Sequence, residues 1–274
     1  MKQIFLFLFL ICNLVLAAQS LKGKKILLYT KNGAGYVHEN IPYALKCFDS
    51  LSRMYQFTLI SSQDSAYFTD NNLKSIDLIV FASTNNDVFA SDAHKLAFRK
   101  YIESGGSFFG IHSAIGTERK WTWMKQMMGG SFAWHPKFQP FKLLKLNAGH
   151  FTNRHLASEW IKKDECYFNK ELYPGYTTTL VVDLQSLKLD STETIKYTQF
   201  RNGFDRYMPI SWEQNFDGGR IFMTTLGHDK TDYSEKNFTT YLVDCMNYLL
   251  KDYKPKDLSK AYATRFDQVV NFLK

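Results

Sequence analysis

The chain has 274 residues, of which 45% are hydrophobic and 16% aromatic, and a formal net charge of +8. This composition supplies a large apolar core and excludes intrinsic disorder, and the length favours one large domain or two small ones. The lysines are scattered and the C-terminal stretch mixes both charge signs. The sequence therefore lacks the concentrated basic surface that is typical of nucleic-acid-binding proteins.

The first residues, MKQIFLFLFLICNLVLAAQS, have the layout of a secretory signal peptide: one lysine, a long apolar run, and then small residues. We expect residues 1–18 to be removed, with cleavage near Ala17 or Ala18. An uncleaved membrane anchor is the alternative, but the apolar run is short for a bilayer span. The sequence predicts an exported protein, periplasmic or extracellular, with no membrane span after cleavage.

Apolar strands alternate with amphipathic helices through the first half of the chain. We expect strands at 24–30, 57–62, 76–83 and 107–112, and helices at 41–54 and 91–104. Alternation of this kind predicts an open, mostly parallel α/β sheet with helices on both faces.

The pattern changes after Trp121. We expect shorter strands with polar alternation at 141–147, 176–184 and 193–200, a last clear strand at 219–227, and a closing helix at 235–250. No Pro-, Gly- or Ser-rich linker divides the sequence. The second half is therefore interpreted as strand and loop insertions within a single domain at 24–250, followed by a C-terminal helical extension at 251–274.

Three cysteines, Cys47, Cys166 and Cys245, follow the predicted signal peptide. Their number is odd, their spacing is wide, and no C-x-x-C motif is present, so neither a disulfide framework nor a cysteine zinc site is indicated. Cys47 and Cys245 lie in segments with helical periodicity, where a buried free thiol is the usual state.

Three of the seven histidines follow predicted strand ends: His38, His112 and His228. In open α/β sheets the loops beyond the carboxyl ends of the strands converge, and ligands bind there. We therefore expect one shared site that holds all three. His135 is a fourth candidate, because Gly129-Gly130 permits a tight turn and Pro136 keeps His135 extended, although a histidine that faces water is equally consistent with that segment.

Acidic candidates for the same site are Asp87, after the third strand, and Glu165 in the segment DECY. The loop around Asp87 is equally well explained as an Asn/Asp turn. Ser113, next to His112, could act as a nucleophile if a base lay within reach, but a serine in such a turn more often caps a helix. His94 is expected on an exposed helix face.

Several segments of the sequence resemble those of the ThuA-like (trehalose utilisation) family, and they occur in the family's order. The resemblance runs over about residues 24–250 and implies a flavodoxin-like fold similar to that of class I glutamine amidotransferases. The segments are GYVHENIP, DLIVFAS, YIESGGSFFGIHSA, WTWMKQMMGGSFAWHP, DECY and PISWEQNFDGGRIFMTTLGHD.

The fold resemblance explains the turn GIHSA. Amidotransferases of this class, and hydrolases with a nucleophile elbow, place a cysteine or serine at such a strand-to-helix turn among small residues. Here His112 holds that position and no cysteine is nearby. Glutamine hydrolysis through a thiolate is therefore excluded, and resemblance in fold does not extend to the reaction.

The family resemblance implies carbohydrate metabolism, with an enzyme that acts on a glycoside or its 3-keto derivative. Imidazole titrates near neutral pH and suits proton transfer. We expect His112 and His228 to move the proton, and His38, His135 and Glu165 to position or polarise the substrate. The remaining candidates for substrate binding are Asp87, Trp121, Trp134 and Trp212, although tryptophan in loops is as often an anchor for packing.

Two other functions remain open. A divalent metal ion held among His38, His112, His135 and His228 would make the protein a metal-dependent hydrolase, although no local H-x-x-x-H or H-E-x-x-H spacing is present. A non-catalytic sugar-binding module could have the same cleft. Within the leading hypothesis, hydrolysis, elimination and isomerisation are all consistent with the sequence.

Overall fold

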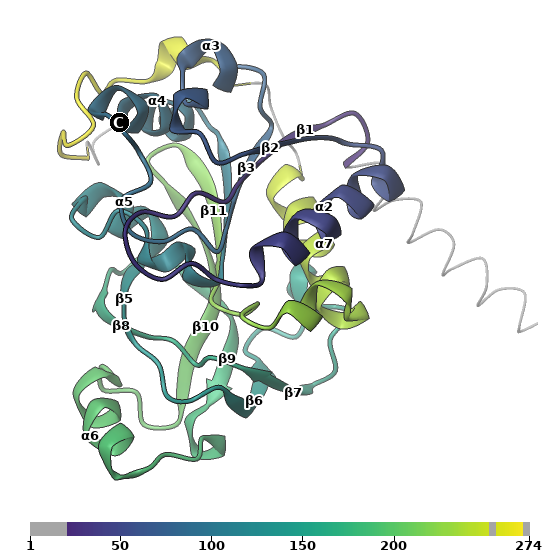
Figure 1. Cartoon of the computed structure of the whole chain (residues 1–274), viewed down its shortest axis with the longest axis vertical. Coiled ribbons are helices and arrows are strands. Elements are labelled where there is room, and N and C mark those ends of the chain that lie inside the picture. Colours follow the sequence, from purple (N-terminus) through teal and green to yellow (C-terminus); the bar gives the residue numbers. More distant parts are fainter. Residues whose placement is uncertain (1–20, 252–255, 271–274) are drawn as a thin grey trace, which may run out of the picture.

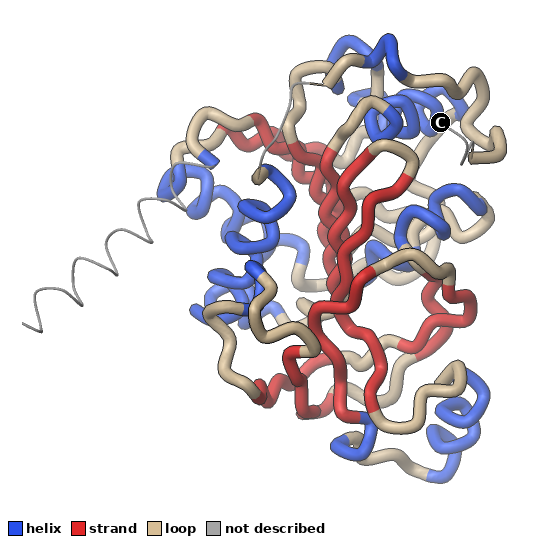
Figure 2. Tube along the Cα trace, turned by 180° about the vertical axis from the view of Figure 1, so that it is seen from behind, coloured by secondary structure: helices blue, strands red, loops and turns tan. Residues whose placement is uncertain are grey.

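The computed structural model describes residues 21–251 and 256–270, so the predicted signal peptide lies outside the described residues. A nine-stranded sheet runs through the centre of the molecule, with helices packed on both faces (Figures 1 and 2). Within the described ranges, no helix combines the length and the apolar character needed to cross a bilayer.

Five neighbouring strands are parallel, in the order β2-β1-β3-β4-β11. Their bounds are Lys25–Tyr29 for β1, Thr58–Ser62 for β2, Leu78–Ala82 for β3, Ser107–Ile111 for β4 and Gly219–Thr224 for β11. Every residue of β3 and β4 is buried, because helices cover both faces of the sheet. This order is that of flavodoxin-like sheets, and the predicted open α/β class is confirmed.

Four further strands continue the sheet from β11 by antiparallel pairing, in the order β10-β9-β6-β7. They are β10 (Tyr207–Phe216), β9 (Thr177–Asp183), β6 (Gln139–Lys145) and β7 (Glu159–Asp164). A separate two-stranded sheet pairs β5 (Gly130–Trp134) with β8 (Phe168–Leu172). Since four antiparallel steps separate β7 from β11, β7 runs in the same direction as the parallel strands.

Helices divide between the two faces according to the alternation of side chains along β1. Ile26 and Leu28 pack in the core beneath α2 (Ile41–Tyr55) and α7 (Lys236–Leu250). Leu27 and Tyr29 point the other way, into the core beneath the helices on the opposite face (Figure 1). Those helices are α4 (Asp92–Glu103) and α5 (Thr122–Met128), with the short α3 (Asp70–Leu73) beside them.

The strand predicted at 193–200 is wrong, since this segment lies in α6 (Ser191–Phe200). Asp190 and Glu193 form a capping box, in which each side chain accepts a hydrogen bond from the backbone N–H of the other. No residue of α6 is buried. Tyr197 and Phe200 are only partly buried against the core, with the ring of Tyr197 5.8 Å from that of Phe168 in β8. This packing does not override the local cap, which determines the conformation.

The predicted C-terminal helical extension is helical only at Leu258–Lys260 in its described part. The chain instead lies against α4, where the Glu103 carboxylate accepts hydrogen bonds from the backbone N–H groups of Tyr262 and Ala263. Backbone groups that bond to side chains of α4 are not available for a helix.

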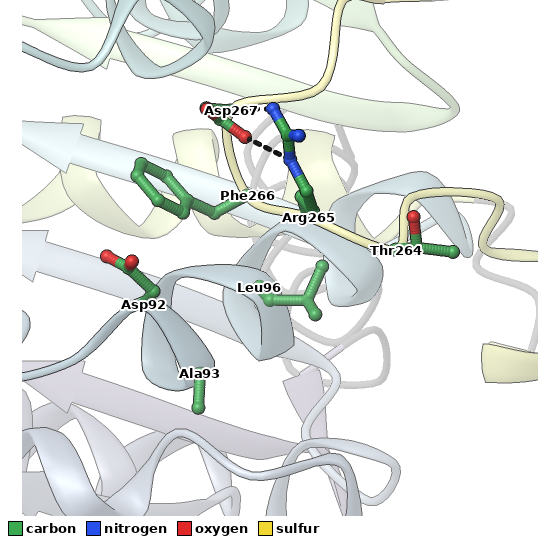
Figure 3. Close-up of a pocket in the computed structure, with 7 residues that line it drawn as sticks. All are labelled: Asp92, Ala93, Leu96, Thr264, Arg265, Phe266 and Asp267. Carbon is green, nitrogen blue, oxygen red and sulfur yellow. Dashed lines mark hydrogen bonds and ion pairs between the residues drawn. The ribbon is translucent and has the colours of Figure 1, made fainter.

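A pocket of about 260 Å³ separates this C-terminal segment from the start of α4 (Figure 3). Its lining includes Asp92 and Leu96 of α4 and Phe266 of the segment, while Arg265 and Asp267 form an ion pair at its rim. None of the residues that the sequence predicts for the functional site lines this pocket.

Candidate functional site

His112 stands at the tip of the turn that follows β4. Its φ of +55° is in the left-handed region, which L-residues seldom adopt and which is typical of functional turns. The preceding Gly110 allows a close approach of the neighbouring strand, because a Cβ built there would lie 2.3 Å from Met223 Sδ. This is the strained strand-to-helix turn that the sequence predicts.

Three other side chains reach His112 from separate strand ends. His38 lies in the loop after β1, His228 follows β11, and Glu165 follows β7 directly. One ligand atom from each of the four residues can be chosen so that all four atoms lie within 4.8 Å of one another. The three histidines therefore lie together, as their places after strand ends predict, and Glu165 adds a carboxylate to the cluster.

The closest contacts in this cluster involve His228 Nδ1. It lies 3.0 Å from Glu165 Oε2 and 3.3 Å from His112 Nε2. His112 Nε2 is 3.6 Å from the same carboxylate oxygen. The Tyr167 hydroxyl lies 3.0 Å from His112 Nε2 and 3.5 Å from His38 Nε2. These five atoms from five residues therefore share one small polar volume.

Hydrogen bonds at the outer edges of two rings determine which nitrogen carries the proton. His112 Nδ1 is 3.1 Å from the Thr225 carbonyl, which can only accept, so Nδ1 is the donor. Ser113 donates its hydroxyl proton to the Thr84 carbonyl and therefore accepts from His38 Nδ1, 3.2 Å away. In both histidines Nε2 is left as a lone pair directed into the cluster.

Burial sets the charge states of these groups. Burial, together with the neighbouring histidines, lowers the pKa of His112 well below its ordinary value, and burial lowers the pKa of His38 to about 4. Burial also acts against the charged forms of His228 and Glu165, but their mutual hydrogen bond and the attraction of neighbouring opposite charges together outweigh it. The pKa of His228 is therefore raised and that of Glu165 lowered, so they form an ion pair beside two neutral imidazoles.

His135 joins the cluster at its outer side. Its Nε2 lies 3.4 Å from Glu165 Oε1, the carboxylate oxygen that His228 does not contact, and its side chain is 33% exposed. Its Nδ1 donates to the Pro136 carbonyl at 2.8 Å. Glu165 therefore bridges a solvent-accessible histidine and the buried histidines.

The Asp164 carboxylate holds the two loops of the cluster together. One of its oxygens accepts from the backbone N–H of Glu165 and of His228, and the other accepts from the backbone N–H of Gly227. Lys162 lies 3.2 Å from Asp164 and forms a second buried ion pair with Asp232. The relative position of His228 and Glu165 thus depends on a fully buried carboxylate.

The other residues predicted for substrate binding lie elsewhere. Trp121 and Trp212 are 3% and 2% exposed, and their indole N–H groups donate to the carbonyls of Phe266 and Met128. Trp134 packs against Phe168, and the exposed Asp87 presses its backbone against Gly33. Trp121 and Trp212 are therefore packing anchors of the core, which is the second of the two roles that the sequence allows for them.

A pocket of about 140 Å³ opens beside His228. Tyr36 and Phe138, which sequence reasoning missed, line it, and both rings contact histidines of the cluster, with centroids 4.8 Å from His38 and 5.3 Å from His228. Tyr167 and Ser113 were likewise not assigned their observed roles. The sequence gives no signal for Tyr167, whose partner His112 lies 55 residues away in the chain. The cap predicted for Ser113 is wrong, because its hydroxyl bonds Thr84 and His38.

The chain is similar to several solved structures. A ThuA-like protein from Bacteroides uniformis ATCC 8492 is 19% identical, with a TM-score of 0.69 over 86% of this chain and 94% of that one. A ThuA-like protein from Parabacteroides merdae ATCC 43184 is 18% identical, with a TM-score of 0.65 over 86% and 93% of the two chains. The β-galactosidase of Rahnella sp. R3 shares the fold at 11% identity, with a TM-score of 0.51 over 84% of this chain and 32% of the enzyme.

No curated protein matches the sequence. The family model for ThuA, described as trehalose utilisation, matches residues 25–249. This match covers the whole nine-stranded sheet and all four strand ends that deliver the cluster. The chain therefore belongs to the ThuA (trehalose utilisation) family.

Proposed function

We propose that the protein is an exported enzyme that acts on a glycoside or its 3-keto derivative at the cluster of His38, His112, Glu165 and His228. The ThuA family gives the chain a carbohydrate-related role. The observation that carries the proposal is the convergence of four chemically active side chains from four separate strand ends. Buried histidines that only fill a core would not need to meet at one point with a carboxylate.

The chemistry of a 3-keto sugar matches this arrangement. In an elimination, the C–H bond beside the carbonyl breaks and its proton goes to a base, while its electron pair forms a C=C bond. The glycosidic C–O bond then breaks, and the departing oxygen takes a proton from an acid. A linked pair of acid and base groups next to a site that stabilises the carbonyl oxygen supports such a reaction.

Exposure distinguishes the roles within the cluster. His112 is fully buried and neutral, and its Nε2 lone pair can accept a hydrogen bond from a substrate hydroxyl, so it suits a fixed contact better than proton exchange with solvent. His135 is partly exposed and contacts Glu165, which makes this pair the better carrier of the transferred proton. The rings of Tyr36 and Phe138 at the pocket supply flat apolar surfaces for a sugar ring.

A panel of 3-keto disaccharides and their unoxidised parents tests the proposal, with products followed by mass spectrometry. We expect at least one 3-keto glycoside to be converted. His112→Ala should reduce the rate by at least about 100-fold because it removes a fixed contact to the substrate, and His228→Ala should do the same because it removes the ion-pair partner of Glu165. His94→Ala is the control, because His94 lies in α4 and contacts Ser65 rather than the cluster. Near-normal rates in both cluster variants, or binding without conversion across the panel, would overturn the proposal.

A further inference from the structure

We propose that His38, His112, His228 and Glu165 form a binding site for one divalent transition-metal ion, of which Zn²⁺ is the best match. The site uses the residues of the proposed function, but the inference does not depend on the identity of the substrate.

The spacing of the ligand atoms fits a tetrahedral ion. A zinc ion with bonds of about 2.0–2.1 Å holds neighbouring ligand atoms about 3.3–3.4 Å apart. His112 Nε2, His228 Nδ1 and Glu165 Oε2 are separated by 3.0, 3.3 and 3.6 Å. These three atoms thus form one face of such a polyhedron. His38, whose ring offers a ligand atom within 4.8 Å of one from each of the other three residues, supplies the fourth ligand.

The protonation of the rings fits a metal site as well. Histidines that bind metals usually donate the other ring N–H to a carbonyl or carboxylate, which fixes the ring and directs the lone pair to the ion. His112 meets this condition through the Thr225 carbonyl, and His38 makes the corresponding bond to the hydroxyl of Ser113. The Thr84 carbonyl holds Ser113 in turn, so that both rings are oriented from outside the cluster.

A plain hydrogen-bonded cluster accounts less well for the same atoms. Three acceptors, His38 Nε2, His112 Nε2 and one Glu165 oxygen, face one another in a largely buried volume. Within the described part of the chain, the donors directed at them are the Tyr167 hydroxyl and His228 Nδ1. Acceptors outnumber donors, and a cation satisfies such an excess of lone pairs.

The donor set also limits the kind of ion. Three imidazoles with one carboxylate suit zinc and its neighbours in the first transition row, whereas Ca²⁺ and Mg²⁺ prefer oxygen ligands. An ion held there would polarise a carbonyl or hydroxyl oxygen of a sugar by taking it as a fifth ligand.

Metal binding is tested on protein purified without a histidine tag, stripped with a chelator and titrated with Zn²⁺ and Co²⁺ by calorimetry. We expect one ion per chain, an increase in melting temperature, and a Co²⁺ absorption spectrum of tetrahedral type. His112→Ala and Glu165→Gln should weaken binding by at least about 100-fold, and Ser113→Ala by about 10-fold through loss of the orientation of His38. His94→Ala should bind as the wild type does.

Glu165→Gln keeps the shape of the side chain, and its circular dichroism and melting show whether the variant is folded. Absence of stoichiometric binding to the wild type, or equal affinity in the folded Glu165→Gln variant, would overturn the metal site. The two proposals can fail separately. Metal binding without conversion of any sugar would leave the metal site standing and refute the proposed function, and conversion that persists in metal-free protein unable to bind Zn²⁺ would do the reverse.

Discussion

At the scale of single residues, the position of His228 relative to Glu165 rests on Asp164. Its two carboxylate oxygens accept three backbone N–H bonds, from Glu165, Gly227 and His228, at 2.8 to 3.1 Å. Asp164 is fully buried, and the Lys162 ammonium lies 3.2 Å away. Both oxygens of the Asp164 side chain must therefore be hydrogen-bond acceptors.

Asp164→Asn should destabilise the protein by about 2–4 kcal/mol, because the amide N–H₂ would face either backbone donors or the buried ammonium of Lys162. Urea unfolding followed by circular dichroism measures the change. Asp49→Asn is the matched control, since Asp49 makes an exposed ion pair with Arg53 within one helix, and its stability should stay unchanged within error. A loss for Asp164→Asn no larger than that of the control would contradict the role assigned to Asp164.

The cluster shows which single residues a sequence can reveal. His38, His112 and His228 could be predicted together, because each follows an apolar strand and parallel strands end at one edge of the sheet. The roles of Ser113 and Tyr167 could not, since each depends on a partner 75 or 55 residues away in the chain. Trp121 and Trp212 gave no signal that separates a buried anchor from an exposed sugar-binding ring.

At the scale of elements, α4 holds the C-terminal segment through a buried ion pair. Arg99 is fully buried and bonds Glu103 at 2.7 Å, while it also donates to the Phe266 carbonyl. Glu103 accepts from the backbone of Tyr262 and Ala263. The segment therefore depends on side chains from one helix rather than on secondary structure of its own.

Glu103→Ala should cost about 3–5 kcal/mol, because among the described residues it leaves the buried Arg99 guanidinium with the more distant Asp217, 3.7 Å away, as its ion-pair partner. It should also release the C-terminal segment, so that trypsin cleaves at Lys260 and Arg265 sooner than in the wild type. Mass spectrometry of timed digests detects those cuts. Glu159→Ala, at an exposed ion pair with Lys142, should leave both readouts unchanged. Cleavage at the wild-type rate in Glu103→Ala would contradict this account.

The two halves of the sheet differ in how well their elements could be predicted. β3 and β4 are buried on both faces, so their sequences are continuous apolar runs, which predict strands at the centre of a sheet. The strand β7, EWIKKD, lies at the sheet edge with mixed burial, and its sequence carries no such run. The β-formers of the segment 193–200 predict a strand, but α6 packs only partly buried side chains, Tyr197 and Phe200, against the core, so its cap outweighs that propensity.

At the scale of the whole molecule, two apolar cores lie on opposite faces of one sheet, and the described residues contain no disulfide. Cys47, Cys166 and Cys245 are free thiols that are buried in the core beneath α2 and α7. Burial raises the pKa of Cys47 to about 12, and it raises the pKa of the other two thiols as well. Reactivity needs both a thiolate and exposure to solvent, so all three are inert in the folded state.

These thiols therefore report on opening of the cores. In the native protein at neutral pH, Cys47, Cys166 and Cys245 should not react with Ellman's reagent, and all three should react in concentrated guanidinium chloride. Ser50→Cys places a thiol on the exposed side of α2 and should react at once, which shows that the reagent is competent. Since labelling must pass through an opened state, the logarithm of its rate should rise in Asp164→Asn in proportion to the measured loss of stability. Fast labelling of the wild type would contradict a closed core. Equal labelling rates in the wild type and in Asp164→Asn would show that the thiols become exposed without unfolding of the sheet.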